Sequence, residues 1–201
     1  MTTLRSKSKQ RIIDAAFEHF VRNGYEGTSL NTIAEAVGIR KASIYTHFKS
    51  KDALFLELLQ DALDIECAYL VTCFSNDSIS TVPGEAYLYE IKSRYENAIT
   101  SQFLTRIAYV PPTHLVDLVS ETYQKYIGQL ILLFKTELSQ SMVDPQDQEL
   151  YTDAYLGILD SLSVELLYDG TMYERRLHAM LMLYSRSLQI DYSSDYLVTL
   201  T

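Results

Sequence analysis

Residues 24–48 read GYEGTSLNTIAEAVGIRKASIYTHF, and this stretch decides the fold class of the chain. Thr28 and Ser29 can accept hydrogen bonds from the free amides that begin a short helix over 30–37. Gly38 ends that helix, because glycine adopts the left-handed backbone conformation at little cost. A second short helical stretch begins only two residues later. The sequence therefore predicts two short helices joined by a tight turn.

An amphipathic helix precedes this pair, and Asn23-Gly24 marks its end. Its apolar residues recur at helical spacing, with charged residues between them: Ile12, Ile13, Ala16, Phe17 and Phe20. A first apolar helix followed by two short ones describes a three-helix helix-turn-helix unit. In such units the last helix enters the major groove of DNA.

The candidate reading helix covers residues 41–48. Ile44 and Phe48 are four residues apart, so we expect both to face the protein core. The side chains that remain face outward and suit a mixture of base-edge and phosphate contacts: Lys41, Ala42, Ser43, Tyr45, Thr46 and His47.

The rest of the chain also shows helical periodicity, and no useful length of period-two alternation occurs. A long helix begins at the cap residue Ser50 and continues to about Phe74, and a polar loop follows over 75–84. The sequence predicts an all-α fold of about nine helices. We expect a DNA-binding domain over 1–48 and a helical regulatory and dimerisation domain over 49–201. The later helices are expected at about 85–107, 113–140, 146–168 and 173–190.

The distribution of charge favours a nucleic-acid partner, although the chain of 201 residues has a net charge of −9. Of its 17 basic and 26 acidic side chains, residues 1–52 hold nine and five, which leaves eight and 21 for the remainder. The first segment is therefore basic and the rest strongly acidic. Such asymmetry is typical of a protein in which one part meets a polyanion.

Several classes of function have no support in the sequence. The longest stretch without a charged residue is Cys67–Asn76, whereas a membrane span needs about 20 apolar residues. The N-terminus lacks an apolar signal core, so we expect a cytoplasmic protein with reduced cysteines. The histidines and cysteines lack metal-ligand spacing, and no catalytic motif is visible, so we expect no metal, no cofactor and no enzyme activity. Buried reduced thiols are the first interpretation of Cys67 and Cys73, and a single redox-sensing thiol is the alternative.

The segments 24–39 and 42–55 resemble the signature of the TetR/AcrR family of bacterial transcriptional regulators, and the similarity covers about residues 8–60. The resemblance implies a homodimer that binds a palindromic operator. It implies phosphate contacts from Thr28, Tyr45, His47 and Lys51, and it implies that Lys41, Ser43 and Thr46 lie nearest the bases. We expect the same surface to include Ser29, Arg40, Ala42 and Lys49. Family members often have Ser or Thr in place of Arg40, and commonly Gly in place of Ala42.

The C-terminal region is rich in tyrosine, which indicates either a tyrosine-rich core or a ligand cavity with an aromatic wall. A cavity of tyrosines and carboxylates favours a cationic or aromatic ligand. The candidate lining residues are Tyr95, Tyr123, Tyr126, Tyr155 and Asp160.

Two apolar stripes on the last long helices predict the dimer interface, since each is wider than one packed neighbour needs. The alternative is that both stripes only close the core of the monomer. The stripes are Tyr155, Ile158, Leu159, Leu162 and Leu166 on one helix and Leu177, Met180, Leu181, Tyr184 and Leu188 on the other.

The sequence as a whole indicates a transcriptional repressor that a small-molecule inducer releases from its operator. The ligand is expected to tilt the helix over 51–74 and to move the reading helices apart. A transcriptional activator of the same fold is the first alternative. A helical ligand-binding or adaptor protein without DNA binding is the second.

Overall fold

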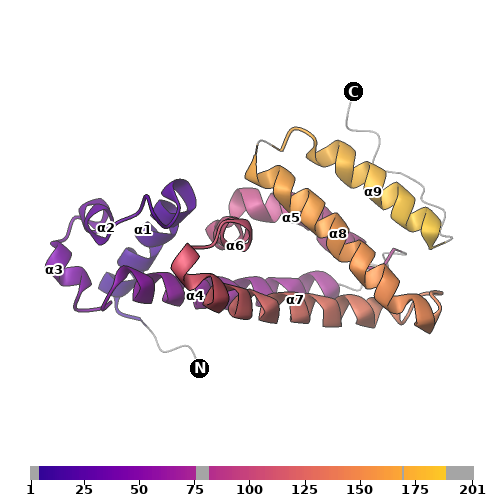
Figure 1. Ribbon diagram of the computed structural model, residues 1–201, viewed down its shortest axis with the longest axis horizontal. Coiled ribbons are helices and arrows are strands. Elements are labelled where there is room, and N and C mark those ends of the chain that lie inside the picture. The colour runs from indigo at the N-terminus through magenta and orange to yellow at the C-terminus, as the bar shows by residue number, and fades with distance from the viewer. Residues whose placement is uncertain (1–4, 76–81, 169, 189–201) are drawn as a thin grey trace. The chain divides into compact units, whose positions relative to one another are not determined.

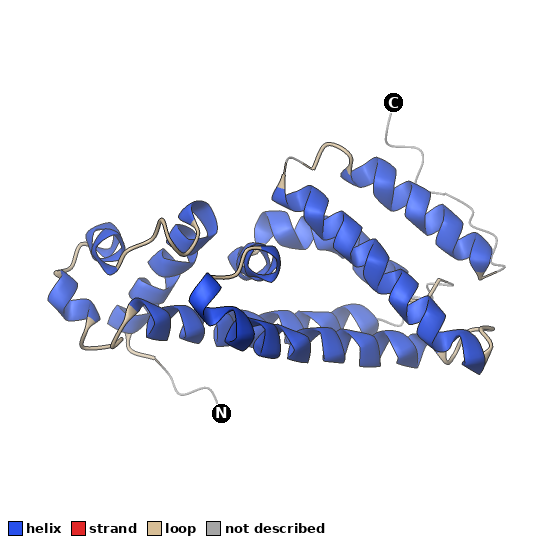
Figure 2. Cartoon of the chain, in the orientation of Figure 1, coloured by secondary structure: helices blue, strands red, loops and turns tan. Residues whose placement is uncertain are grey.

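The computed structural model describes residues 5–75, 82–168 and 170–188, and every regular element in these ranges is a helix (Figures 1 and 2). The predicted all-α fold is therefore confirmed. The elements are α1 Lys7–Asn23, α2 Leu30–Val37, α3 Lys41–Ile44, α4 Lys51–Ser75, α5 Glu85–Asn97, α6 Ile99–Tyr109, η1 Thr113–Leu115, α7 Val116–Leu138, η2 Pro145–Asp147, α8 Gln148–Leu167 and α9 Tyr173–Ser187. None of the described helices is long and apolar enough to cross a membrane.

Packing divides the chain into two compact units. The first comprises the residues up to Tyr69 together with Arg94–Gly128, and the second comprises Leu70–Ser93 together with the residues from Gln129 onward. Helices α4, α5 and α7 thus contribute residues to both units. The boundary expected after residue 48 is a division by function, and it stays a prediction.

The core of the first unit forms around the inner face of α1. The five apolar residues predicted for this face are all buried, as are Ile44 and Phe48. Phe17 packs edge-on against Phe103 of α6 with ring centroids 5.3 Å apart, and Phe20 packs on Phe55 of α4 at the same distance. Helices α1, α2 and α3 therefore share one core with α4 and α6, which fixes the surface that α2 and α3 present.

Local hydrogen bonds set the limits of α2. The Ser29 hydroxyl accepts from the backbone amide of Thr32, and the Thr32 hydroxyl accepts in return from the amide of Ser29. Gly38 ends the helix with φ 74°, in the left-handed region, as the sequence predicted.

Helix α3 is shorter than the prediction of 41–48, which is wrong at its C-terminal end. Regular α-helix ends at Ile44, and turns follow over 45–47. The backbone amides of His47 and Phe48 both donate to the Ile44 carbonyl, and the Thr46 hydroxyl donates to the Ser43 carbonyl at 2.7 Å. These bonds tighten the backbone and satisfy carbonyls that a longer helix would use.

The expected helix over 85–107 is in fact two helices. Ala98 has an extended backbone conformation (φ −129°, ψ 113°), which separates α5 from α6. The break places the start of α6 next to α4, since the Thr100 hydroxyl lies 2.5 Å from a carboxylate oxygen of the buried Glu66. The same carboxylate accepts two hydrogen bonds from the Arg94 guanidinium at 2.9 and 3.0 Å.

Tyrosine forms part of the core in the second unit. Tyr155 is fully buried and stacks on Phe134 with ring centroids 4.1 Å apart. Its hydroxyl donates to the Gly84 carbonyl at 2.9 Å, and the Gly84 amide donates to the Glu137 carboxylate at 2.7 Å. Burial raises the pKa of Glu137. Tyr155 therefore forms part of the core of the second unit, with its hydroxyl buried as well.

Candidate nucleic-acid interface

The outward face predicted for residues 41–48 is at the surface. Tyr45 is 51% exposed, and Lys41, Ala42 and Thr46 are also exposed, whereas Ser43 and His47 are half-buried. Three further expected residues, Ser29, Arg40 and Lys49, are exposed too. We call residues 30–48 the reading segment, because they form α2, α3 and the turns that end at Phe48.

The reading segment is held to the rest of the first unit by its apolar side chains. Ile33, Ala34 and Ile44 are almost completely buried in the common core. The Arg11 guanidinium of α1 donates to the Val37 carbonyl at 2.8 Å, which satisfies a carbonyl at the end of α2. The apolar side of the reading segment is therefore packed on the core, and the polar face of α3 is directed to solvent.

Thr28 does not lie on this outward face, although the family resemblance implied a phosphate contact. Its side chain is buried, with 2% of the residue exposed. The hydroxyl lies 2.7 Å from the Gly24 carbonyl and 3.1 Å from the His19 carbonyl. The structure thus assigns the Thr28 side chain to the packing of the loop between α1 and α2.

Lys51 also has partners inside the protein. Its amine donates to the carbonyls of Tyr25 and Thr28 at 2.9 and 3.1 Å and lies 3.8 Å from the centroid of the Tyr25 ring. These contacts fasten the loop between α1 and α2 to the first turn of α4. The expected phosphate contact of Lys51 would compete with them.

Two other basic residues near the N-terminus are paired with carboxylates of α4. The Arg5 guanidinium donates to both oxygens of Asp61 at 2.5 and 2.6 Å and also lies 3.0 Å from Glu57. The Lys9 amine lies 2.8 Å from the same Glu57 carboxylate. The positive charge of the N-terminal segment therefore reaches solvent mainly at exposed side chains: Lys7, Arg11, Arg22, Arg40, Lys41 and Lys49.

Sequence reasoning missed a polar cluster at the first turn of α4. The Tyr25 hydroxyl donates to one oxygen of Asp52, and Nε2 of His114 lies 3.5 Å from the other oxygen. The hydrogen bond from Tyr25 lowers the pKa of Asp52, and burial, aided by the Asp52 charge, raises the pKa of Tyr25. Nothing in the sequence around His114 indicates this contact, because its partners lie in distant segments.

The residues proposed to line a ligand cavity are divided between the two compact units. Tyr95, Tyr123 and Tyr126 belong to the first unit, and the Tyr123 and Tyr126 rings lie 5.8 Å apart. Tyr155 and Asp160 belong to the second unit, where Tyr155 fills the core and Asp160 is exposed. Burial raises the pKa of Tyr95. Within the first unit, Tyr95, Tyr123 and Tyr126 stay candidates for a common lining.

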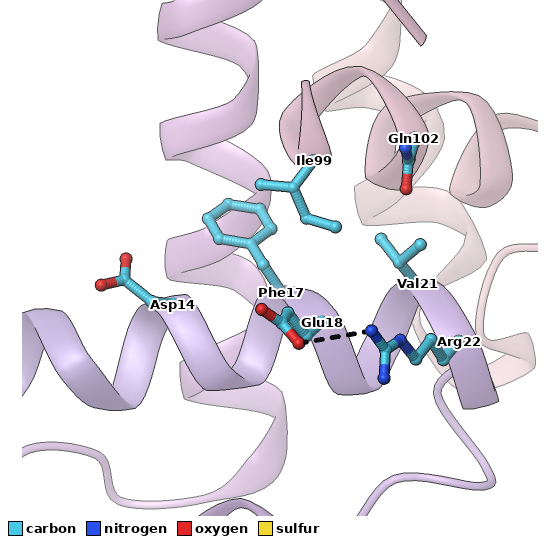
Figure 3. A pocket seen from close by; sticks show the side chains of 7 residues that line it. All are labelled: Asp14, Phe17, Glu18, Val21, Arg22, Ile99 and Gln102. Atoms are coloured by element: carbon cyan, nitrogen blue, oxygen red, sulfur yellow. Dashed lines mark ion pairs between the residues drawn. The ribbon is translucent and has the colours of Figure 1, made fainter. Parts of the chain in front are cut away.

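A pocket of about 400 Å³ does occur in the first unit, between α1 and α6 (Figure 3). Phe17 and Val21 of α1 point toward α6, where Ile99 and Gln102 form the other side. The Glu18 carboxylate lies 3.7 Å from the Arg22 guanidinium at the rim. The remaining lining residue is Asp14.

The two stripes predicted for the dimer interface lie largely within the single chain. Tyr155, Leu162 and Leu181 are completely buried, and five more of the ten residues are at most 9% exposed. Leu166 and Met180 are half-buried. The monomer core therefore covers most of both stripes, because α8 and α9 pack side by side within the second unit (Figure 1).

Another apolar face of α8 and α9 remains at the surface. Leu150 and Leu183 are each 67% exposed, and they help to line a pocket of about 380 Å³. The hydroxyl of Tyr184, which also lines this pocket, is buried without a hydrogen-bond partner among the described residues. The other lining residues are Tyr151, Ala154, Ile158, Met180 and Ser187.

A model of the family described as bacterial regulatory proteins, tetR family, matches residues 12–58. The chain carries the N-terminal domain of the tetR family. This TetR-family domain is 43% identical over 56 residues to the negative transcriptional regulator IcaR of the icaADBC biofilm operon of Staphylococcus aureus, a match that covers 28% of this chain and 30% of IcaR. It is 40% identical over 65 residues to the transcriptional regulator RutR of Escherichia coli, a match that covers 32% of this chain and 31% of RutR. The chain thus matches about a third of the length of these relatives.

The likeness in fold extends beyond the TetR-family domain. A TetR transcriptional regulator from Legionella pneumophila superposes with a TM-score of 0.70 at 22% identity and covers 90% of this chain and all of its own. The helices that follow the TetR-family domain therefore share the fold of that solved regulator. In the part of the chain that the structure describes, no group of three or more His, Cys, Asp or Glu residues is placed to hold a metal ion.

Proposed function

We propose that this TetR-family protein binds double-stranded DNA through its reading segment and represses transcription. The observation that carries the proposal is the exposed polar face of α3 and its following turn, which is supported by buried Ile44 and Phe48 within a matched TetR-family domain. Lys41, Ser43 and Thr46 are the side chains proposed to lie nearest the bases. The proposed phosphate contacts are Tyr45, His47, Lys49 and Arg40. The relative IcaR is named a negative regulator, which favours repression over activation.

Titration of the protein against the DNA upstream of its own gene, at several salt concentrations, tests this function. Binding through lysine and arginine contacts to phosphates should weaken steeply as salt rises, because each contact releases condensed counterions. An adaptor protein without DNA binding would give no salt-dependent complex at all. Replacement of Lys41 or Thr46 by Ala should also change the preference for operator over random DNA. Equal losses on both DNAs would contradict the assigned base-reading face.

We propose further that the protein is a homodimer that joins through α8 and α9, so that two reading segments meet a palindromic operator. The exposed Leu150 and Leu183 and the pocket that they help to line support this choice of face. A second copy would cover this apolar surface. Ile158, Met180 and Tyr184 of the predicted stripes line the pocket on this face, and the other stripe residues form the layer beneath it.

The mass in solution tests the dimer. Sedimentation at micromolar concentration should give twice the 23.0 kDa of one chain. Leu183→Glu should shift the mass toward that of a monomer, since it places a charge on the apolar face. Leu132→Glu is the matched control, because Leu132 of α7 is equally exposed but lies on another helix. A dimer mass that Leu183→Glu leaves unchanged would exclude this interface.

An effector that releases the DNA completes the proposed function. Helix α4 contributes residues to both compact units, so a ligand that changes its packing also changes the reading segment, which shares a core with α4. Tyr95, Tyr123 and Tyr126 are the proposed aromatic lining for a cationic or aromatic compound. Operator release measured against a library of such compounds identifies the ligand. A confirmed ligand that acts equally on the Tyr123→Ala variant would exclude this lining.

A further inference from the structure

Three segments that are distant in sequence meet at the first turn of α4. They are the loop between α1 and α2, which contains Tyr25, the first turn itself with Lys51 and Asp52, and the 3-10 helix η1 with His114. All of them belong to the first compact unit. The loop leads directly into α2 and thus into the reading segment.

Tyr25, in the loop, contacts both of the other segments of this cluster. Its ring packs edge-on against Phe55 and His114, with centroids 5.2 Å away in both cases, and its hydroxyl donates to Asp52. The Lys51 amine lies over the ring and donates to the Tyr25 carbonyl. The backbone and the side chain of this residue are therefore both fastened to α4.

His114 is the contact that comes from outside the DNA-binding helices. Its imidazole faces the carboxylate of Asp52 and the edge of the Tyr25 ring, and the side chain remains 49% exposed. Such exposure means that the ion pair alone adds little to the stability of the fold. Its position matters more, because it joins η1 to the same carboxylate that holds the loop.

We propose that His114 is a positioning residue for DNA binding and that the Tyr25–Asp52–His114 cluster keeps the reading segment in its DNA-competent arrangement. The role rests on the proposed function but requires no contact between His114 and DNA. When the cluster is incomplete, the loop samples more conformations. The fraction of molecules with a competent reading segment then falls, and the apparent affinity falls by the same factor.

The test compares DNA affinity and backbone hydrogen exchange in the full-length protein. His114→Ala should weaken operator binding about fivefold, the lower end of typical coupling between sites. It should also accelerate amide exchange over residues 25–48. Thr113→Ala is the matched control, because Thr113 is an exposed neighbour in the same 3-10 helix, and it should change neither quantity.

Two further variants separate positioning from a general loss of stability. His114→Gln keeps a donor for the Asp52 carboxylate and should restore most of the affinity. Asp52→Asn keeps an acceptor for the Tyr25 hydroxyl but removes the charge that His114 faces. Because this substitution and His114→Ala act on the same contact, their effects should not be additive in the double variant. Additive losses, or a His114→Ala protein with wild-type affinity and exchange, would overturn the proposal.

Failure of the proposed function would look different. In that case the wild-type protein binds no DNA, whereas amide exchange over residues 25–48 still responds to His114→Ala and not to Thr113→Ala. The positioning of the reading segment by the cluster would then stand without a DNA partner. No response in either measurement would exclude both the cluster and its role.

Discussion

Tyrosine is exposed in the reading segment but buried in the tyrosine-rich core of the second unit. Tyr45 presents its ring to solvent with 51% exposure, whereas Tyr155 is completely buried and donates its hydroxyl to the Gly84 carbonyl. A tyrosine is therefore no evidence of a ligand site by itself. Whether a tyrosine packs in the core or stays exposed depends on its contacts, and these contacts come from other segments of the chain.

The same contrast holds among the basic residues of the first unit. Lys51 and Lys49 are two residues apart, yet the Lys51 amine is held by two carbonyls and a ring while Lys49 is exposed. Both were expected to contact DNA. The structure indicates that Lys51 stabilises the fold and that Lys49 is available to a phosphate.

The largest effect is expected from Gly84→Ala in the second unit. A Cβ at Gly84 would come within 2.4 Å of the Tyr155 ring, and the backbone there has φ 75°. We expect a loss of about 2–4 kcal/mol in the free energy of unfolding, because the core must shift and the backbone is strained. Chemical denaturation measures it.

Gly128→Ala in α7 is the control for this prediction. Nothing lies within 4 Å of a Cβ at that position, and the residue is helical. Alanine should stabilise the protein there by up to about 1 kcal/mol. If both variants were equally stable, the tight packing between Gly84 and Tyr155 would be contradicted.

A smaller loss of stability is expected from Lys51→Ala. The substitution removes two hydrogen bonds and the contact with the Tyr25 ring, so about 1–3 kcal/mol should be lost. Lys49→Ala should change stability by less than about 0.5 kcal/mol, as is usual at an exposed site. Thermal unfolding of both variants decides whether the two lysines differ in this way.

For DNA binding, the substitution at Lys49 should have the larger effect on the salt dependence. Lys49→Ala should weaken binding to all sequences and should reduce the slope of log affinity against log salt by about 1, since one phosphate contact is lost. The slope for Lys51→Ala should stay near that of the wild type. A reduced slope for Lys51→Ala alone would show that its amine leaves the Tyr25 loop for a phosphate.

The smallest effect concerns the pH dependence of stability. The pKa of Asp52 is lowered chiefly by the hydrogen bond from Tyr25, so its charged form stabilises the fold above the pKa of the unfolded chain. That contribution is lost as the pH falls through the lowered pKa. Asp52→Asn should therefore show a shallower loss of stability between about pH 5 and about pH 2. If both proteins lost stability equally as the pH fell, the pKa of Asp52 would not be lowered in the folded protein.

Much of the first unit was predictable because its signals are local. The buried face of α1, the cap of α2 at Ser29 and the inward direction of Ile44 and Phe48 all follow from residues within one or two turns of each other. The end of α3 was predicted less well. Whether regular helix continues beyond Ile44 depends on competing hydrogen bonds that leave no periodic pattern.

The sequence by itself determined the all-α fold, the TetR-family domain and the outward polar face of the reading segment, since apolar periodicity and cap residues act over short distances along the chain. Only the tertiary structure decided the fate of individual polar groups. Lys51 finds its carbonyl partners 26 and 23 residues away, Tyr155 finds Gly84 71 residues away, and His114 reaches Asp52 from the 3-10 helix η1. Hydrogen bonds and ion pairs form between whatever groups the packed core brings within about 3 Å, and no local pattern records that meeting.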